Sequence, residues 1–304
     1  MKIIVFVVAL VALAQASYFL QTPQIHHVNN QKALWTAGLN EQFLGMTDAE
    51  LKAFLNYEHI IRDAVPVTAK DLGVNENEIP ESYDVRTNTG CGNYILNQGS
   101  CGSCWAFAAA SSTTDRFCIA TKNTSFPVLS PQELVNCDSR NHGCNGGVYD
   151  YAHNYIRDRG LSTDKCMSYV SGKTRKAEQC KQICDDGSMP VKFYHDNTPI
   201  QYYHTVQDIQ AAILTHGSAK LGMAVYADFM SYKSGIYHHV SGSLRGGHAL
   251  RIIGWGVEDG VDFWTVANSW GSGWGENGYF RIRRGVNESN IESRGAIAGV
   301  PLVQ

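Results

Sequence analysis

The chain has little net charge and, after its first residues, no hydrophobic run long enough to span a bilayer. Its 304 residues carry 25 Lys and Arg against 28 Asp and Glu, which gives a formal charge of -3. A nearly neutral chain lacks the basic surplus that binds nucleic acids or anionic membranes. We therefore expect neither nucleic acid nor a membrane as a partner. Internal repeats and low-complexity tracts are also absent, and the length suffices for one large or two ordinary cores.

One short apolar run at the start predicts a signal peptide. A positive start (residues 1–2) precedes the apolar run (residues 3–14), which ends in an A-x-A cleavage pattern at residues 14–16. The run is too short to span a bilayer comfortably. We expect residues 1–16 to be removed and the mature protein to travel through the secretory pathway, to a lysosome-like vacuole, the extracellular space, or both.

The first 90 residues and the last 120 contain no cysteine. The nine cysteines are Cys91, Cys101, Cys104, Cys118, Cys137, Cys144, Cys166, Cys180 and Cys184. In an oxidising pathway most of them should be paired. An odd number leaves at least one thiol unpaired if no bridge is intermolecular, and Cys104 is our candidate.

The cysteine-free front of the chain predicts a prosegment. Residues 47–50 form a capping box, and apolar residues follow at helical spacing over 51–55. Residues 75–78 are polar and suit a linker that a protease could reach. We expect residues 17–79 to be a propeptide and residues 80–304 to be the main domain. A small independent domain at the front is the alternative.

The main domain divides into a helical half and a β half. Helical patterns dominate residues 83–166, while β-branched and aromatic residues mark strands at 250–255, 262–267 and 279–284. One helix is expected near 206–215. The division predicts an α+β fold with a cleft between its halves.

The stretch before Cys104 predicts an activated nucleophile. Residues 98–103 form a glycine-rich turn, and a helical, Ala-rich run follows Cys104. With Ser103 as N-cap, Cys104 lies in the first helical turn, where free N–H groups and the helix dipole favour a thiolate. The alternatives are that Cys101 and Cys104 are both bridged structural cysteines, or a C-x-x-C redox pair.

A predicted hairpin supplies the partners that such a cysteine needs. A turn at residues 257–260 would place His248 and Asn268 near each other at its open end. A neutral amide there would orient the imidazole without adding charge. Gln98, just before Cys104, could donate its side-chain N–H to an oxyanion, together with the Cys104 backbone N–H. The alternative for His248 is a buried core histidine.

Four blocks together resemble the papain family of cysteine proteases. They are QGSCGSCWAF at 98–107, CNGG at 144–147, GGHA at 246–249 and NSWG at 268–271. Residues 252–257, 264–270 and 291–301 look specifically cathepsin B-like, as does WTAGLN at 35–40 in the front piece. The resemblance covers essentially the whole chain after the signal peptide, with the blocks in family order.

The resemblance implies a papain-like two-lobed fold, with a helical left lobe, a β-barrel-like right lobe and the active-site cleft between them. It implies a cysteine endopeptidase that forms a thioester acyl-enzyme and that residues 17–79 inhibit. The implied catalytic residues are Cys104 as nucleophile, His248 as base and acid, Asn268 as its orienting group and Gln98 in the oxyanion hole. The implied substrate-binding residues are Gly146, Gly147, Ala249, Trp270, Trp274 and Arg294.

The resemblance also implies the disulfides, which sequence arithmetic alone leaves open. They are Cys91–Cys118, Cys101–Cys144, Cys137–Cys180 and Cys166–Cys184. Asn123 and Asn287 stand in glycosylation sequons. We expect no metal and no cofactor. The expected partners are protein or peptide substrates, the chain's own propeptide and cystatin-like inhibitors, and the expected state is a monomer.

Two departures from the cathepsin B pattern stand out. Residues 166–180 span the region of the occluding loop without extra cysteines or a histidine, so we expect an open cleft and weak exopeptidase activity. The pair His238 and His239 lies elsewhere, in a predicted strand, and is expected to be solvated or packed. Arg294 stands where cathepsin B has a glutamate at the floor of the P2 pocket, which should disfavour basic P2 residues unless Arg294 bends out to solvent.

Three competing interpretations fit less well. A non-enzymatic relative would be expected to lack one of the four catalytic residues, and all four are present. A thioredoxin-like protein would place its C-x-x-C after a strand in a small α/β unit. Transglutaminases use a similar triad, but their motifs come in a different order.

Overall fold

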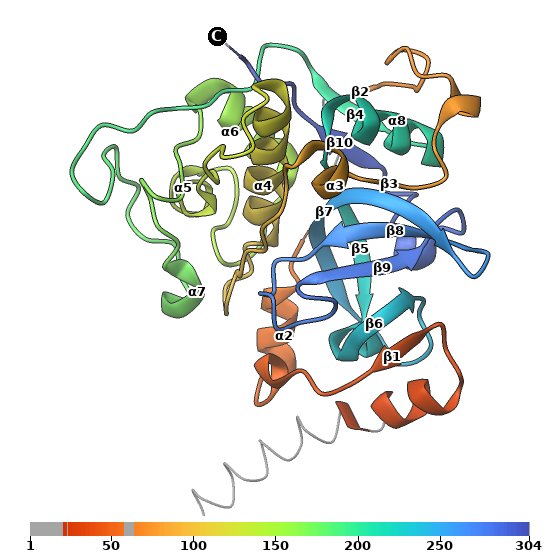
Figure 1. Cartoon of the computed structure of the whole chain (residues 1–304). Helices are drawn as coiled ribbons and strands as arrows, with labels where there is room; N and C mark the ends of the chain where they lie inside the picture. Colours follow the sequence, from red (N-terminus) through yellow and green to blue (C-terminus); the bar gives the residue numbers. More distant parts are fainter. Residues whose placement is uncertain (1–20, 23, 58–63, 304) are drawn as a thin grey trace, which may run out of the picture.

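The computed structural model describes residues 21–22, 24–57 and 64–303, with one half mainly helical and the other built on a sheet (Figure 1). This confirms the predicted α+β fold. The predicted signal peptide, residues 1–16, lies outside the described residues. Among the helices that are described, none has the length and apolar character needed to cross a membrane.

The helical half surrounds one long central helix. It contains α4 (Cys104–Ala120), α5 (Pro131–Cys137), α6 (Tyr149–Arg159) and α7 (Ser171–Thr174). Alanines at 106 and 108–110 keep the surface of α4 narrow, so neighbouring elements approach it closely and bury almost its full length. Helix α5 begins with Pro131 in its first turn and with the Ser130 hydroxyl accepting from the Glu133 N–H. Short α3 (Val85–Thr89) precedes this half.

The other half is built on a ten-stranded sheet with strand order β1-β6-β9-β8-β7-β5-β10-β4-β2 and with β3 paired to β7. The bounds are β1 Trp35–Ala37, β2 Ala64–Pro66, β3 Tyr83–Asp84, β4 Ile200–Tyr203, β5 Ala219–Tyr226, β6 Tyr232–Tyr237, β7 Leu244–Glu258, β8 Val261–Ala267, β9 Tyr279–Arg283 and β10 Ala296–Ala298. Helix α8 (Val206–His216) packs near the β4 end, capped by Thr205 (Figure 1).

The β7–β8 hairpin forms where the predicted turn at residues 257–260 indicates, with Glu258 opposite Val261. An irregularity between Ile252 and Gly254 shifts the pairing by one, because an extra residue in one strand delays its partner. Beyond the hairpin ladder, His248 and Asn268 meet.

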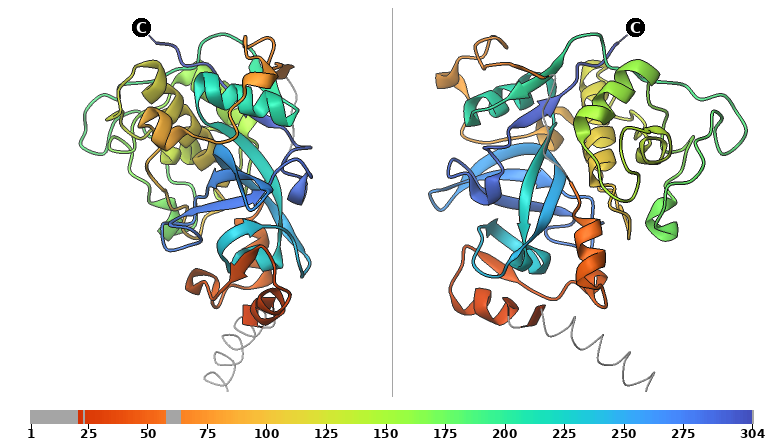
Figure 2. Two further views of the ribbon diagram at one scale, coloured as in Figure 1. Left: turned by 45° about the vertical axis from the view of Figure 1, so that its right-hand side comes forward. Right: turned by 180° about the vertical axis from the view of Figure 1, so that it is seen from behind.

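The front of the chain has no core of its own among the described residues. Strand β1 extends one end of the sheet beside β6, and β2 extends the other beside β4. Helix α2 (Asp48–Phe54) begins at the predicted capping box of Thr47 and Glu50, and it stands between the sheet and the helical half (Figure 2). Apolar side chains such as Trp35 and Phe54 join the same core cluster as the sheet.

Four disulfides tie the helical half together. They join Cys91 to Cys118, Cys101 to Cys144, Cys137 to Cys180 and Cys166 to Cys184, the pairs that the resemblance implies. Cys104 is free and buried. Both the C-x-x-C redox pair and the doubly bridged alternative are therefore wrong, because Cys101 is bonded elsewhere and Cys104 is bonded to nothing.

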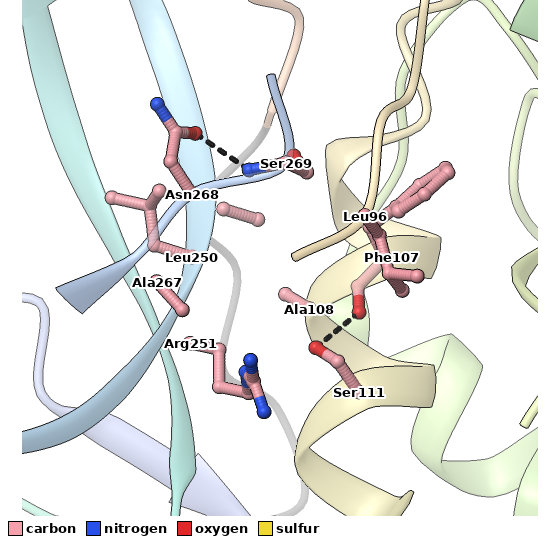
Figure 3. Close-up of a pocket in the computed structure, with 10 residues that line it drawn as sticks. Leu96, Phe107, Ala108, Ser111, Leu250, Arg251, Ala267, Asn268 and Ser269 are labelled. Atoms are coloured by element: carbon pink, nitrogen blue, oxygen red, sulfur yellow. Dashed lines mark hydrogen bonds between the residues drawn. The ribbon is translucent and has the colours of Figure 1, made fainter. Parts of the chain in front are cut away.

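A buried ion pair joins the two halves below the cleft. Arg251 of β7 projects toward α4 (Figure 3), and its Nη1 lies 2.7 and 2.6 Å from the two carboxylate oxygens of Asp115. The hydroxyls of Tyr94 and Ser218 also donate to this carboxylate, at 2.9 and 2.6 Å. With every contact a donor, the carboxylate is fully satisfied as an anion.

We predict that Asp115→Asn lowers the free energy of unfolding by about 3 kcal/mol, because it leaves the Arg251 guanidinium buried without its counter-charge. Urea denaturation followed by fluorescence measures the loss. Asp158→Asn is the matched control, since Asp158 pairs with Arg157 at the surface and should cost under about 1 kcal/mol. Equal losses in the two variants would contradict the argument.

Candidate active site

Cys104 is the first residue of α4. The Sγ atom faces backbone N–H groups of Cys104, Trp105 and Ala249, all of which stabilise a thiolate. Ser103 is the N-cap residue of α4, as predicted, but its hydroxyl makes no capping hydrogen bond and instead lies 2.8 Å from the Tyr169 hydroxyl. The helix start nevertheless presents its free N–H groups to the sulfur.

His248 and Asn268 are brought together as the hairpin predicts. The Nε2 atom of His248 lies 2.8 Å from Asn268 Oδ1, and Trp270 stacks on the imidazole at 4.8 Å between ring centres. Asn268 Oδ1 also accepts from the Ser269 N–H at 2.8 Å. This second bond holds the amide so that its oxygen faces the ring. The imidazole therefore carries its proton on Nε2, and Nδ1 has no hydrogen-bond partner among the described residues.

Burial keeps the cysteine and the histidine uncharged in this state. It raises the pKa of Cys104 to about 11. It also lowers the pKa of His248 to about 4, against the opposing effect of the Asn268 hydrogen bond. Withdrawal from water penalises a thiolate and an imidazolium alike. Between pH 5 and 8 the covered site therefore holds a neutral thiol and a neutral imidazole.

Gln98 is fixed in position by its own side-chain contacts. Its Nε2 donates to the Cys101 carbonyl at 2.9 Å, and its Oε1 accepts from the Ser269 hydroxyl at 2.7 Å. The amide group of Gln98 thus keeps one further N–H, which is the donor that an oxyanion hole requires.

Two pairs of glycines, Gly146–Gly147 and Gly246–Gly247, line opposite sides of the groove that the front segment occupies. Tyr57 makes a parallel bridge with Gly147, and Asn56 makes one with Gly247. The Gly247 N–H donates to the Leu55 carbonyl at 2.9 Å. A Cβ atom at Gly146 would collide with the Asn56 carbonyl oxygen. Only walls without side chains let an extended peptide lie this close.

Beside these walls lies a pocket that Tyr57 fills. The Tyr57 ring is buried and stacks on Tyr149 at 4.9 Å between ring centres, with Ala249 in the same cluster. Arg294 is half-buried at this pocket and donates to the Met223 carbonyl at 3.4 Å. Its side chain lies near enough to Tyr57 to act on that phenol electrostatically, so it has not bent away to solvent.

The two predicted tryptophans lie toward the opposite end of the cleft. Trp270 contacts Trp274 at 5.0 Å between ring centres, and Phe43 and Phe54 of the front segment cover Trp270 at 5.1 and 5.5 Å. Trp274 lines an adjoining groove of about 650 Å³ together with Asn97 and Lys233. The front segment thus occupies both ends of the cleft.

Tyr57, Tyr149 and Ser269 were not predicted from the sequence as site residues. Ser269 stands within the fourth motif, which is a signal for its role. Nothing in the local pattern indicates that Tyr57 would meet Tyr149, because the contact joins residues 92 positions apart in the printed sequence.

The predicted strand at His238 and His239 is wrong, since β6 ends at Tyr237. His239 instead packs on the Tyr226 ring at 3.9 Å and bonds to Asp228, as the packed alternative predicts. Among the residues described, no three His, Cys, Asp or Glu side chains are grouped as a metal site would require.

The two sequon asparagines are both exposed. The Asn123 amide oxygen accepts one N–H, from Ser125 at 3.0 Å. Asn287 is more firmly held, because its amide oxygen accepts from the N–H groups of Glu292 and Ser293. Glycosylation at either position stays a prediction.

Known proteins similar to this chain share one family. The profile of the family "Papain family cysteine protease" matches residues 79–298. Cathepsin B-like CP2 of Giardia intestinalis is 35% identical over 292 residues, covering 95% of this chain and 97% of that protein. Cathepsin B-like cysteine proteinase 4 of Caenorhabditis elegans is 35% identical, with 91% of each chain covered.

Solved structures agree with this comparison. ProCathepsin B S9 from Trypanosoma congolense superposes with a TM-score of 0.82 at 29% identity, covering 92% of this chain and 97% of that chain. Digestive procathepsin L2 proteinase of Tenebrio molitor superposes with a TM-score of 0.76 at 26% identity, covering 96% and 93%.

We predict that iodoacetamide alkylates Cys104 slowly in the full-length chain, and faster as the pH rises through 9. The raised pKa keeps the thiol protonated below that pH, and the thiolate is the reacting form. Mass spectrometry of the labelled protein measures the rate, with Cys104→Ser as the unlabelled control. Rapid alkylation of the full-length chain at pH 6 would show that the covered site is not in the neutral state.

Proposed function

Since the chain belongs to the papain family of cysteine proteases, we propose that it is a cysteine endopeptidase made as an autoinhibited zymogen. The observation that carries this proposal is the placement of Cys104 at the start of α4, beside Ala249 and therefore next to the His248–Asn268 pair. That arrangement supplies a nucleophile, a base and a group that orients the base.

The chemistry follows from these groups. His248 takes the thiol proton on Nδ1, and the Cys104 sulfur attacks the carbonyl carbon of the scissile peptide. The Gln98 side-chain N–H and the Cys104 backbone N–H stabilise the oxyanion. His248 then returns the proton to the leaving amine, which departs and leaves a thioester. Water, deprotonated by His248, attacks the thioester and releases the acid, and the proton goes back to sulfur.

Asn268 and Trp270 support the histidine rather than react. Asn268 accepts from Nε2–H and so keeps Nδ1 directed to the sulfur, and the amide adds no charge. Trp270 covers the imidazole face and shields the contact between His248 and Asn268 from water. The geometry they maintain is what the proton transfers require.

We attribute the inhibition to residues 17–79. Their segment from Leu55 to Tyr57 occupies the groove between the glycine walls, where a substrate backbone would pair. Residues 75–78 are exposed and precede the matched family region, which suits cutting near 78–79. Release of the segment would return water to the site and remove the penalty that burial places on charge. Cys104 and His248 could then form a thiolate–imidazolium pair.

We further propose an open cleft and a P2 preference set by Arg294. Residues 166–180 carry no histidine that could hold a substrate's C-terminal carboxylate. Arg294 lies at the pocket filled by Tyr57 and brings a positive charge to it. Basic P2 residues should be repelled, while apolar, aromatic or acidic residues are accepted.

We predict that the trimmed protein cleaves Phe-Arg and Val-Val-Arg fluorogenic peptides at least about tenfold more efficiently than Arg-Arg, because burying a P2 arginine beside Arg294 costs on the order of 1.4 kcal/mol or more. Arg294→Glu should reverse this order. Values of kcat/KM for the three peptides measure it.

Two controls test the assignment. Cys104→Ala and the epoxide inhibitor of papain-type enzymes should each abolish cleavage. Cleavage that survives both would contradict the nucleophile. Substantial release of C-terminal dipeptides would contradict the open-cleft endopeptidase.

We predict that acid releases the front segment. Hydrogen bonds from the Thr47 backbone and hydroxyl, with a smaller contribution from Arg175, lower the pKa of Glu50 below its ordinary value of 4.5. Its ionised form therefore stabilises the bound segment above about pH 4.5, and this contribution is lost as the pH falls through the lowered pKa.

Glu50→Gln should accordingly speed trimming at pH 6, and this effect should shrink as the pH falls below 4.5 and through the lowered pKa of Glu50. Gel analysis of trimming as a function of pH checks this, with the exposed Glu41→Gln as matched control.

Autoinhibition itself has a separate test, which compares the peptidase activity of the two forms. A full-length chain as active as the trimmed one would rule out autoinhibition.

A further inference from the structure

We propose that Arg175 and Arg245 form a carboxylate-binding pair on the leaving-group side of the cleft, giving the mature enzyme a preference for substrates with a carboxylate after the scissile bond. This inference rests on the proposed protease function and adds a specificity that the catalytic residues do not provide.

The first observation is how the front segment is held. Two carboxylates of α2 reach opposite walls of the cleft. Asp48 lies 3.0 Å from Arg245 of β7, and Glu50 lies 3.0 Å from Arg175, which follows α7 in the helical half. The segment that occupies the cleft is thus recognised through its acids from both sides.

The second observation is where these pairs lie along the cleft. Helix α2 ends at Phe54, which packs on Trp270, and the preceding Ala53 carbonyl abuts Gly102 beside the nucleophile. Tyr57 and its pocket lie on the other side of that point. The arginines therefore belong to the end of the cleft flanked by Trp270 and Trp274. Because the Tyr57 pocket is the proposed P2 site, this opposite end receives the leaving group.

The third observation is that these arginines depend on the front segment for their partners. Among the described residues, Glu50 is the one acid paired with Arg175, and Asp48 the one acid paired with Arg245. Lys233, which lines the groove beside Trp274, is likewise bonded to Asn40 of the front segment. Removal of the segment leaves three cationic side chains without these partners along one end of the cleft.

Arg175 is also fixed relative to the nucleophile. Its N–H closes α7 on the Ser171 carbonyl at 2.8 Å, and α7 is tied to the turn before Cys104 by the Ser100 N–H, which donates to the Gly172 carbonyl at 2.9 Å. The guanidinium lines a groove with Ser100, Gly102 and Glu50. A carboxylate held there lies close to the reacting centre, and arginine is the side chain best suited to bind it.

We assign the carboxylate to an internal Asp or Glu side chain of the substrate, because the proposed open-cleft endopeptidase releases C-terminal dipeptides only weakly. Two pairs of quenched fluorescent peptides separate this source from a C-terminal carboxylate, all with the same residues before the scissile bond. One pair carries Glu or Gln at the second residue after it. The other ends there as a free acid or as an amide.

For the trimmed protein we expect kcat/KM to be about fivefold higher for Glu than for Gln, which is the size expected of a partly exposed ion pair. The free acid should have no such advantage over the amide. Raising the ionic strength to 0.5 M should shrink the ratio. Arg175→Asn and Arg245→Gln should each bring the ratio toward one, and Arg175→Lys should keep part of it.

The variants are chosen so that folding does not confuse the result. Arg175 has φ +60°, a conformation that Asn tolerates well. Lys173→Gln, on the exposed surface of the same short helix, removes an equal charge outside the groove and should leave both ratios unchanged. Because each ratio is internal to one protein sample, partial unfolding cancels.

The outcomes are distinguishable. A Glu-to-Gln ratio of one in the wild type, or a ratio that survives Arg175→Asn and Arg245→Gln, overturns the carboxylate pair while leaving the protease assignment standing. A preference for the free acid alone overturns the assignment to an internal side chain and contradicts the open cleft. A trimmed protein that cleaves none of these peptides nor the fluorogenic ones overturns the proposed function itself.

Discussion

The Asp115–Arg251 ion pair sets how α4 lies against β7. Asp115 stands three turns after Cys104 on the helix, and Arg251 stands three residues after His248 on the strand. Helix α4 and strand β7 are therefore joined at two points. One is the Asp115–Arg251 ion pair, and the other is the contact between Cys104 and the Ala249 backbone. A rotation or shift of α4 would separate this buried, fully hydrogen-bonded ion pair, which is energetically costly. The ion pair therefore helps to hold Cys104 in position relative to His248.

Close backbone approach is the second constraint. The glycine walls accept an extended chain through main-chain contacts, and these contacts do not depend on the sequence of that chain. The same shape therefore admits the tethered front segment and a diffusing substrate. Because the front segment is tethered, its effective concentration at the groove is high, and it is favoured over a diffusing substrate while it stays attached.

Local signals account for what the sequence predicted well. The capping box at Thr47 and the turn before Cys104 are each decided within a few residues. The hairpin placed His248 near Asn268 because its turn is also a local signal. The cleft roles came from the family resemblance, since separations of more than a hundred residues are not determined by local pattern.

The features that the sequence did not predict depend on tertiary contacts rather than on local signals. The one-residue irregularity between Ile252 and Gly254 was not predicted, because packing rather than the local sequence determines such a shift. His239 left the predicted strand because Asp228 and Tyr226 give it a better-satisfied position in the turn that follows. The position of Tyr57 against Tyr149 depends on the path of the whole front segment, and no short sequence pattern predicts that path.

The front segment also closes both ends of the sheet, with β1 beside β6 and β2 beside β4. Its loss would turn two interior strands into edges with unpaired N–H and C=O groups, which other chains can join by adding a strand. Strand β4 is only four residues long, and β6 carries Lys233 and Gly235, features that resist such pairing. If residues 17–79 are removed as proposed, the three-residue edge strands β1 and β2 are replaced as edges by β6 and β4. The solubility of the trimmed protein then depends on how poorly these two strands serve as templates for aggregation.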